Sequence, residues 1–330
     1  MERRTLGNSD LTIAPIGLGA WAIGGGDWIF GWGPQNDAES LATIRRAIDC
    51  GINWIDTAAV YGLGHSETIV ARALRDIPRR ERPYIFTKCS LVWDDLGNVS
   101  HSLKPPSIRR EAEASLRRLD VDCIDLYQID WPVWPNSPSG HDPGSLEGAW
   151  ETMAALQREG RARFIGVSNC DADQLARLQP IAPITTLQAP YSLMRREIED
   201  GTLPFCARHN IAVIGYSPMQ SGLLVGKMTA DRINGLPHND WRHRSPDFQE
   251  PTLTRALRLV EQLRAVGARH ARTPGEVAIA WTLHNPAVSG AIVGARRPHQ
   301  VDEIVGAAGL GLTAEDLAEI ELASWSACGR

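Results

Sequence analysis

Several features that would define other classes of protein are missing from this sequence of 330 residues. It has no apolar run of about 18 residues, the length that a membrane-spanning helix needs. The N-terminal segment MERRTLGNSD carries charged residues but is not followed by an apolar segment, so we expect no signal peptide. The 34 Lys and Arg residues against 39 Asp and Glu give a formal net charge of −5. That balance argues against a nucleic acid or an anionic membrane as partner.

Cysteine and glycine patterns exclude two further classes of site. None of the six cysteines belongs to a Cys-x-x-Cys pair or has a histidine at a metal-ligand spacing. This predicts no metal site and is typical of a cytoplasmic protein with reduced thiols. No Gly-x-Gly-x-x-Gly motif follows an apolar run and opens a helix, so a Rossmann-type cofactor site is not supported.

Short apolar runs that alternate with amphipathic segments dominate the chain. We expect strands at residues 16–19, 53–56, 84–88, 123–129, 164–168, 186–188, 211–217 and 291–294. The helical stretches between and after them are residues 38–50, 66–74, 107–119, 146–159, 172–178, 203–209 and 298–305. Gly51 and Gly160 stand where helices end in a left-handed residue. Eight such units predict an α/β fold, a (β/α)8 TIM barrel that forms a single domain over residues 1–330.

Two stretches interrupt this pattern and predict long loops at the C-terminal mouth of the barrel. Residues 131–145 and 219–251 are rich in Pro, Gly, Asn and His and show no helical stripe. Each follows a predicted strand, and in α/β barrels the loops after the strands build the functional site.

Polar residues that close the predicted strands suggest where chemistry takes place. Asp56 ends the second strand, and Tyr61 follows five residues later on its loop. Lys88 ends the third strand and Asp130 follows the fourth. Each residue alone is most simply a solvent-facing side chain, but their shared placement at strand ends predicts one common site.

Motifs along nearly the whole chain resemble the aldo-keto reductase family. They are IGLGAW at 16–21, NWIDTAAVYGLGHSE at 53–67, TK at 87–88, DLYQIDWP at 125–132, GVSN at 166–169, YSPMQSGLLVGKM at 216–228 and GARRPHQVDE at 294–303. Their order is similar to bacterial members related to inositol-utilisation and general-stress reductases, and to potassium-channel β subunits. The resemblance implies NADP(H) and a catalytic tetrad of Asp, Tyr, Lys and His. Asp56, Tyr61 and Lys88 match its first three members, whereas Asp130 stands where the family usually has His.

The same resemblance implies which residues bind the cofactor. Arg296 and Arg297 would contact the 2′-phosphate with Lys227 as a further cation, Gln300 and Glu303 the adenine, and Tyr216 the nicotinamide face. Ser168, Asn169 and Gln188 match the residues that hold the carboxamide. The full implied set is Ala20, Trp21, Asp56, Ser168, Asn169, Gln188, Tyr216, Ser217, Pro218, Gly222, Leu223, Lys227, Gly294, Arg296, Arg297, Gln300 and Glu303.

Side-chain chemistry predicts a proton transfer at Tyr61. Hydride reduction of a carbonyl leaves an alkoxide that needs a proton, and a tyrosine with a pKa near 10 is a poor acid unless a cation lowers that value. We expect Lys88 to lower the pKa of Tyr61, and Asp56 to hold Lys88 charged and oriented. An ionised Asp130 would accept hydrogen bonds from a polyol or sugar, whereas a protonated one would donate to the substrate oxygen. A solvent-facing Asp130, and an engineered change from His, also stay open.

Tryptophans in the predicted mouth loops suggest an aromatic substrate pocket. We expect Trp28, Trp32, Trp93 and Trp131 to line it, with Trp21 and Trp134 beside them, because indoles pack on sugar rings and aromatic compounds. Trp54 and Trp281 are expected in the core. The sequence thus predicts an NADP(H)-dependent oxidoreductase that interconverts a small-molecule carbonyl and alcohol, on a sugar-like, polyol or other hydroxyl-rich substrate. An epimerase or double-bond reductase that uses Asp130, and a cofactor-sensing regulatory subunit, are the alternatives.

Overall fold

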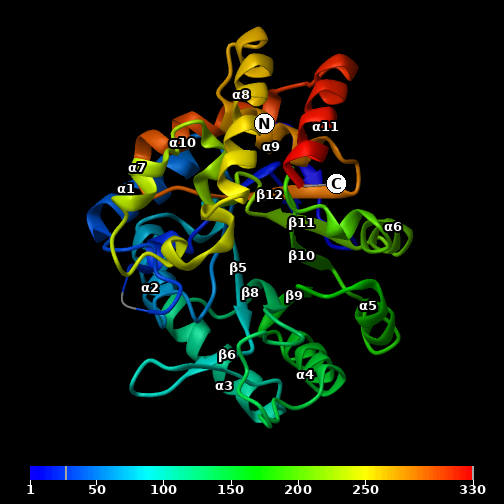
Figure 1. Cartoon of the computed structure of the whole chain (residues 1–330). Helices are drawn as coiled ribbons and strands as arrows, with labels where there is room; N and C mark the ends of the chain where they lie inside the picture. Colours follow the sequence, from blue (N-terminus) through cyan, green and yellow to red (C-terminus); the bar gives the residue numbers. More distant parts are fainter. Residues whose placement is uncertain (27, 329–330) are drawn as a thin grey trace.

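Eight parallel strands close into a barrel in the computed structural model, which describes residues 1–26 and 28–328, and side chains up to residue 324 (Figure 1). The chain forms the (β/α)8 barrel that the sequence predicts, and each predicted strand is present with ends that shift by a few residues. They are β3 (Ile16–Gly19), β4 (Trp54–Asp56), β5 (Tyr84–Cys89), β8 (Ile124–Ile129), β9 (Ala162–Ser168), β10 (Thr186–Pro190), β11 (Ala212–Tyr216) and β12 (Val288–Gly294). Pairing of β12 with β3 closes the barrel.

Helices surround the strands in Figure 1. Those at the predicted positions are α1 (Asp37–Asp49), α2 (His65–Leu74), α3 (Pro105–Leu119), α4 (Leu146–Arg158), α5 (Ala172–Leu178), α6 (Thr202–Arg208) and α10 (Pro298–Val305). Gly51 and Gly160 follow α1 and α4 with φ of 89° and 74°, as the sequence predicts. The sequence did not identify α8 (Thr252–Arg269), α9 (Pro274–His284) and α11 (Ala314–Cys328), of which α8 and α11 pack side by side.

The barrel interior changes from apolar at its N-terminal end to polar at its C-terminal end. Trp54 and Phe86 pack at the apolar N-terminal end. The hairpin of β1 (Arg4–Thr5) and β2 (Thr12–Ile13) contributes to the same cluster. Because residues two apart on a strand point to the same side, Asp56 and Lys88 face the same interior one layer higher. This layering brings the polar strand ends together at the mouth.

Two mouth segments differ from their predicted form. Residues 131–145 form an irregular loop, as expected. Residues 219–251, however, are not one long loop, because they contain the short helices η4 (Gln220–Val225), α7 (Ala230–Asn234), η5 (Trp241–Arg244) and η6 (Pro246–Phe248). Capping side chains of Thr229, Asp240 and Ser245 begin the last three, a local signal that hydrophobic periodicity does not carry. An additional hairpin, β6 (Leu91–Trp93) and β7 (Val99–His101), follows β5.

A helix that crosses a bilayer must be both long enough and apolar enough, and the helices of the described residues can be judged on both counts. None of them meets both requirements.

Candidate active site at the barrel mouth

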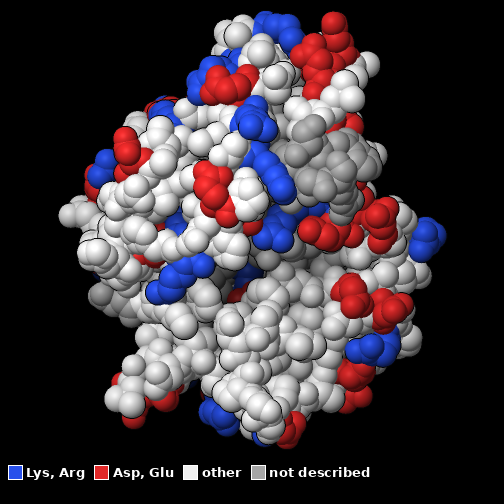
Figure 2. Space-filling model, in the orientation of Figure 1, with Lys and Arg blue, Asp and Glu red and all other residues white. Residues whose placement is uncertain are grey.

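One cavity of about 1130 Å³ occupies the C-terminal mouth of the barrel. Its walls come from the ends of the strands and from the loops of residues 21–36, 130–136 and 216–242. Ligand pockets for single small molecules occupy roughly 300–1,000 Å³, so this cavity has room for a dinucleotide and a substrate together. Figure 2 shows a hollow near the middle of one face, with Lys and Arg side chains at its rim.

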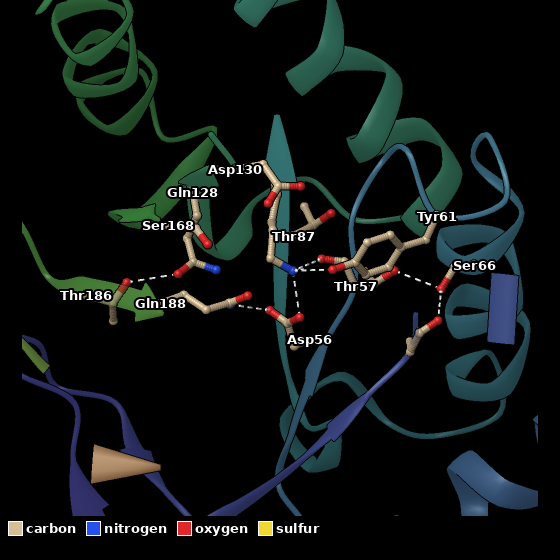
Figure 3. A network of polar contacts seen from close by, with 12 residues as sticks. Asp56, Thr57, Tyr61, Ser66, Thr87, Gln128, Asp130, Ser168, Thr186 and Gln188 are labelled. Carbon is tan, nitrogen blue, oxygen red and sulfur yellow. Dashed lines mark hydrogen bonds and ion pairs between the residues drawn. The ribbon is translucent and has the colours of Figure 1, made fainter. Parts of the chain in front are cut away.

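Lys88 organises the polar floor of this cavity. Figure 3 shows its partners Asp56, Thr57 and Tyr61, with Gln188 next to Asp56. Lys88 Nζ donates to Asp56 Oδ2 at 2.6 Å, to the Thr57 carbonyl at 2.9 Å and to the Tyr61 hydroxyl at 3.2 Å. Gln188 Nε2 donates to the other oxygen of Asp56 at 2.8 Å. An ammonium has three N–H bonds, so these three acceptors use all of them. The Tyr61 oxygen therefore accepts a hydrogen bond, and its own O–H is left to point toward a ligand.

The pKa of Tyr61 differs from the sequence-based expectation. Burial raises the pKa of Tyr61 well above its usual value, and the Asp130 and Asp56 carboxylates raise it further. Lys88 acts in the expected direction and lowers the pKa of Tyr61, but it does not outweigh burial. The expected net lowering is thus wrong for the protein alone, because desolvation of a phenolate costs more than one already paired ammonium returns.

Asp130 lies beside this group and faces the cavity, so it is not a solvent-facing carboxylate. The residue is 7% exposed. Burial raises the pKa of Asp130 to about 6, while Lys88 lowers it and Asp56 raises it. Within the described part of the chain no group donates a hydrogen bond to the Asp130 carboxylate, which contrasts with the paired Asp56. Buried carboxylates need donors, so a ligand that supplies O–H or N–H groups suits this position.

Aromatic rings line the part of the cavity next to Tyr61. Trp28 and Trp21 lie with ring centroids 6.0 and 6.3 Å from that of Tyr61. From Trp28 the contacts continue through Phe30 and Trp134 to Trp131, with successive centroids 5.5–5.7 Å apart. Trp32, which also lines the cavity, packs edge-on against Trp21 with ring centroids 5.2 Å apart.

Trp93 does not belong to this wall, so its expected place in the pocket is corrected. It does not line the cavity, and the Arg118 guanidinium covers its ring at 5.7 Å. Leu91, at the start of β6, lines the cavity, but Trp93, two residues further along the strand, does not. Trp54 and Trp281 are buried in the core, as expected.

Most residues of the implied cofactor set line the other part of the cavity. They are Trp21, Asp56, Ser168, Asn169, Gln188, Tyr216, Ser217, Pro218, Gly222, Lys227, Gly294, Arg296, Arg297, Gln300 and Glu303. Ala20 and Leu223 do not line it. Ala20 is buried and its N–H donates to the Asp56 carbonyl, whereas Leu223 packs in a separate apolar cluster. The Tyr216 hydroxyl donates to Asn169 Oδ1 at 2.9 Å.

Arg296 holds a neighbouring loop in addition to lining the cavity. Its Nε donates to Gln35 Oε1 at 2.6 Å, and its terminal nitrogens donate to the carbonyls of Trp32 and Pro34. Gln300 Oε1 accepts the backbone N–H groups of Arg296 and Arg297 at 2.8 and 3.0 Å. The start of α10 is therefore capped by its own side chain, and a phosphate there would compete with Gln300.

Two other cations of the cavity are paired with carboxylates. Lys227 Nζ lies 2.7 Å from Glu303, and Arg297 Nε lies 3.5 Å from Glu39. Both pairs are largely solvent-exposed, and exposed ion pairs are weak. A phosphate dianion can displace such partners, so the residues present fit a nicotinamide dinucleotide with its phosphates at this end and its ring near Tyr216.

Sequence reasoning missed several lining residues, above all those of η5. The Trp241 ring stacks on Trp21 at 5.2 Å, and the Arg242 guanidinium lies 4.6 Å from the Trp32 ring. Asp240, fully buried, pairs with Arg242 at 2.6 Å. The local signal was the capping Asp240 followed by an aromatic and basic residues, and it lies in a stretch without hydrophobic periodicity.

Comparisons with known proteins agree with this site. A family model described as the aldo/keto reductase family matches residues 15–324. The closed barrel and the Asp–Lys–Tyr group at its mouth agree with this match to an oxidoreductase family. The chain belongs to the aldo/keto reductase family, whose members use nicotinamide cofactors.

Two sequences and one solved structure are similar to this chain over nearly its whole length. The aldo-keto reductase YhdN of Bacillus subtilis (strain 168) is 36% identical over 97% of this chain and 92% of its own length. The NADH-specific methylglyoxal reductase of Escherichia coli (strain K12) is also 36% identical, over 96% of each chain. The structure of a glycerol dehydrogenase from Gluconobacter oxydans superposes with a TM-score of 0.86 at 34% identity, covering 98% of this chain and 95% of its own.

Proposed function

We propose that this protein is an NADP(H)-dependent oxidoreductase in which Tyr61 exchanges the proton with the substrate oxygen. The observation that supports this most directly is the saturation of Lys88. Because all three of its N–H bonds are used and one ends on the Tyr61 oxygen, the Tyr61 hydrogen is free for a substrate. The bound nicotinamide would supply or accept the hydride.

The residues around Tyr61 support this proton transfer in different ways. Lys88 stabilises the phenolate that forms when Tyr61 gives up its proton during reduction, and it offers the same stabilisation when Tyr61 starts an oxidation as the base. Asp56 keeps Lys88 charged and fixes its position, and Gln188 holds Asp56. The aromatic wall excludes water from the reacting atoms, which strengthens these interactions.

The substrate we propose is sugar-like, a polyol or another hydroxyl-rich compound. Asp130 is mostly ionised above its pKa of about 6, so at neutral pH it accepts hydrogen bonds and does not donate them. Substrate hydroxyls would supply the missing donors, and the neighbouring indoles would pack on the C–H faces of the carbon skeleton.

NADP(H) is the proposed cofactor because Arg297 and Lys227 offer two exposed cations at the phosphate end of the cavity. Glu39 and Glu303 partly neutralise them. One relative is described as NADH-specific, so the preference for NADP(H) has to be measured for this chain.

The experiment that tests the function is turnover by wild type and by Tyr61→Phe, with glyceraldehyde and NADPH as the probes. We expect the variant to bind NADPH as wild type does but to lose about 10²–10⁴-fold in kcat, because it has no proton to give. Near-full activity of the Phe variant would assign the proton to another group, with Asp130 as the first candidate.

A further inference from the structure

The two consecutive peptides on either side of Trp131 are held by side chains from three different segments of the chain. The Asp130 carbonyl accepts from Asn169 Nδ2 at 2.9 Å. The Trp131 N–H donates to Ser90 Oγ at 3.2 Å, and its carbonyl accepts from His101 Nε2 at 2.9 Å. The backbone around Trp131 therefore depends on the residue that follows β5, on β7 and on the residue that follows β9.

His101 is fixed in one protonation state by this contact. A carbonyl oxygen only accepts hydrogen bonds, so His101 Nε2 must carry a proton. The residue is 2% exposed, and burial lowers the pKa of the imidazole, which keeps it neutral. The His101 carbonyl in turn accepts from His141 Nε2 at 2.6 Å. His101 thus links the hairpin to both ends of the irregular loop at residues 131–145.

Ser90 adopts a backbone conformation that a side chain disfavours. Its φ is 87°, and the residue is completely buried. Its N–H donates to Glu111 Oε2 at 2.9 Å, and Ser107 Oγ binds the other oxygen of Glu111 at 3.2 Å. A strained residue persists only where its surroundings hold it, and such residues cluster at functional sites. Here the conformation aims the Ser90 hydroxyl at Trp131.

We propose that Ser90 and His101 are positioning residues that fix the Asp130 carboxylate and the Trp131 indole against the substrate. The β6–β7 hairpin is then a determinant of substrate specificity, although its Trp93 does not line the cavity. The inference rests on the proposed function, because it assumes that the substrate lies against Asp130 and Trp131. The loop after Asp130 has no regular structure, so these side-chain contacts provide the order that backbone pairing gives elsewhere.

The test compares His101→Phe, which cannot donate, with His101→Gln, which can, and with Ser90→Ala. Glyceraldehyde and 4-nitrobenzaldehyde serve as substrates with NADPH. We expect His101→Phe and Ser90→Ala to raise the KM for glyceraldehyde about tenfold, with the NADPH Kd within about twofold of wild type. His101→Gln should recover most of this loss. Ser100→Ala, on the same strand but on its opposite face, is the matched control and should match wild type.

Hydrogen exchange of the Trp131 amide provides a readout that does not need turnover. We expect faster exchange in Ser90→Ala, whose residue 90 no longer accepts that N–H, and unchanged exchange in Ser100→Ala. If wild type turns over no carbonyl, the proposed function fails. The exchange data still decide whether Ser90 holds the Trp131 amide. Unchanged KM and unchanged exchange in Ser90→Ala would overturn the inference. A loss of NADPH binding in Ser90→Ala that accompanies the rise in KM would also overturn it. Both of these outcomes are read from Ser90→Ala, so they decide the inference even if His101→Phe does not fold.

Discussion

Asp130 is the residue at which this chain differs most from the pattern it otherwise follows. Its carboxylate is buried next to an ammonium whose hydrogen bonds are already used, so its protonation state decides what the site offers a substrate. Burial and the Asp56 charge together raise the pKa of Asp130 to about 6. A carboxylate therefore prevails at neutral pH, and a hydrogen-bond donor appears only in acid.

The pH dependence of reduction should report this titration. Below its pKa of about 6, Asp130 holds a proton that can stabilise the developing alkoxide, so we expect kcat/KM for aldehyde reduction to rise as pH falls through that value. At neutral pH, Asp130→His should increase reduction of 4-nitrobenzaldehyde and weaken use of glyceraldehyde, shifting their kcat/KM ratio about tenfold. Both substrates are measured across pH in wild type and variant.

Asp130→Asn is the control for that pH profile, because its amide does not titrate. The rise in kcat/KM as the pH falls through the pKa of Asp130 should be absent in this variant. If the rise persists, or if Asp130→His leaves the ratio between the two aldehydes unchanged, Asp130 lies outside the reach of the substrate.

The proposed preference for NADP(H) can be tested at single residues, at the pair of Arg297 and Glu39. Arg297→Ala should weaken NADPH binding by about 1.5–3 kcal/mol, the value of a charge-assisted phosphate contact, and leave NADH binding unchanged. Glu39→Gln should strengthen NADPH binding, because it frees Arg297 from its carboxylate partner. Titration of both cofactors measures this, with Arg45→Ala on the same helix as Glu39 for comparison. Equal effects on NADPH and NADH would contradict a 2′-phosphate contact.

At the scale of elements, α3 carries a buried acid that makes stability depend on pH. Burial raises the pKa of Glu111 from 4.5 to about 8 in the folded protein. A carboxyl with a raised folded-state pKa favours folding while it is protonated, so its contribution is lost as pH rises between about 4.5 and 8. We expect Glu111→Gln to lose less stability than wild type between pH 6 and pH 9.

The measurement is the urea midpoint of unfolding of both proteins at both pH values. A difference of at least about 1 kcal/mol in the pH effect is expected. Equal pH effects in the two proteins would mean that Glu111 is ionised in the fold across this range. Glu113→Gln, on the same helix, should behave as wild type.

The elements that the sequence predicted are those whose burial is periodic. The runs ending in Asp56 and Lys88 alternate with amphipathic helices, so the barrel and its polar strand ends were predictable. The β6–β7 hairpin and η5 were not, because each has few residues and depends on contacts with distant segments. The placement of Trp93 outside the pocket follows from a hairpin that residue spacing did not indicate. The net pKa of Tyr61 depends on burial, which no motif records.

At the scale of the whole molecule, the cavity draws its walls from β3 to β12, including the seam where the barrel closes. The lining runs from Gly19 to Ile304, so a ligand in this cavity contacts segments that only folding brings together and binds only the folded state. We therefore expect NADPH at about 100 times its Kd to add about 2.7 kcal/mol to the free energy of unfolding. Thermal unfolding with and without NADPH measures this.

Tyr61→Phe should show the same stabilisation, because it removes a proton donor and no cofactor contact. Adenosine, which lacks both phosphates and nicotinamide, serves as the weak-binding reference. If neither NADPH nor NADH shifts the unfolding transition, the cavity does not hold a nicotinamide dinucleotide.

The chain of indoles around the cavity also gives the protein an optical property. Trp21, Trp32 and Trp241 pack against one another, and Tyr61 links Trp21 to Trp28. The Nε1 atoms of Trp28, Trp32 and Trp241 are buried and find no acceptor within the described residues. Excitation absorbed anywhere in such an array migrates between neighbouring rings. A reduced nicotinamide would collect it and emit, so the site carries its own reporter of occupancy without an added dye.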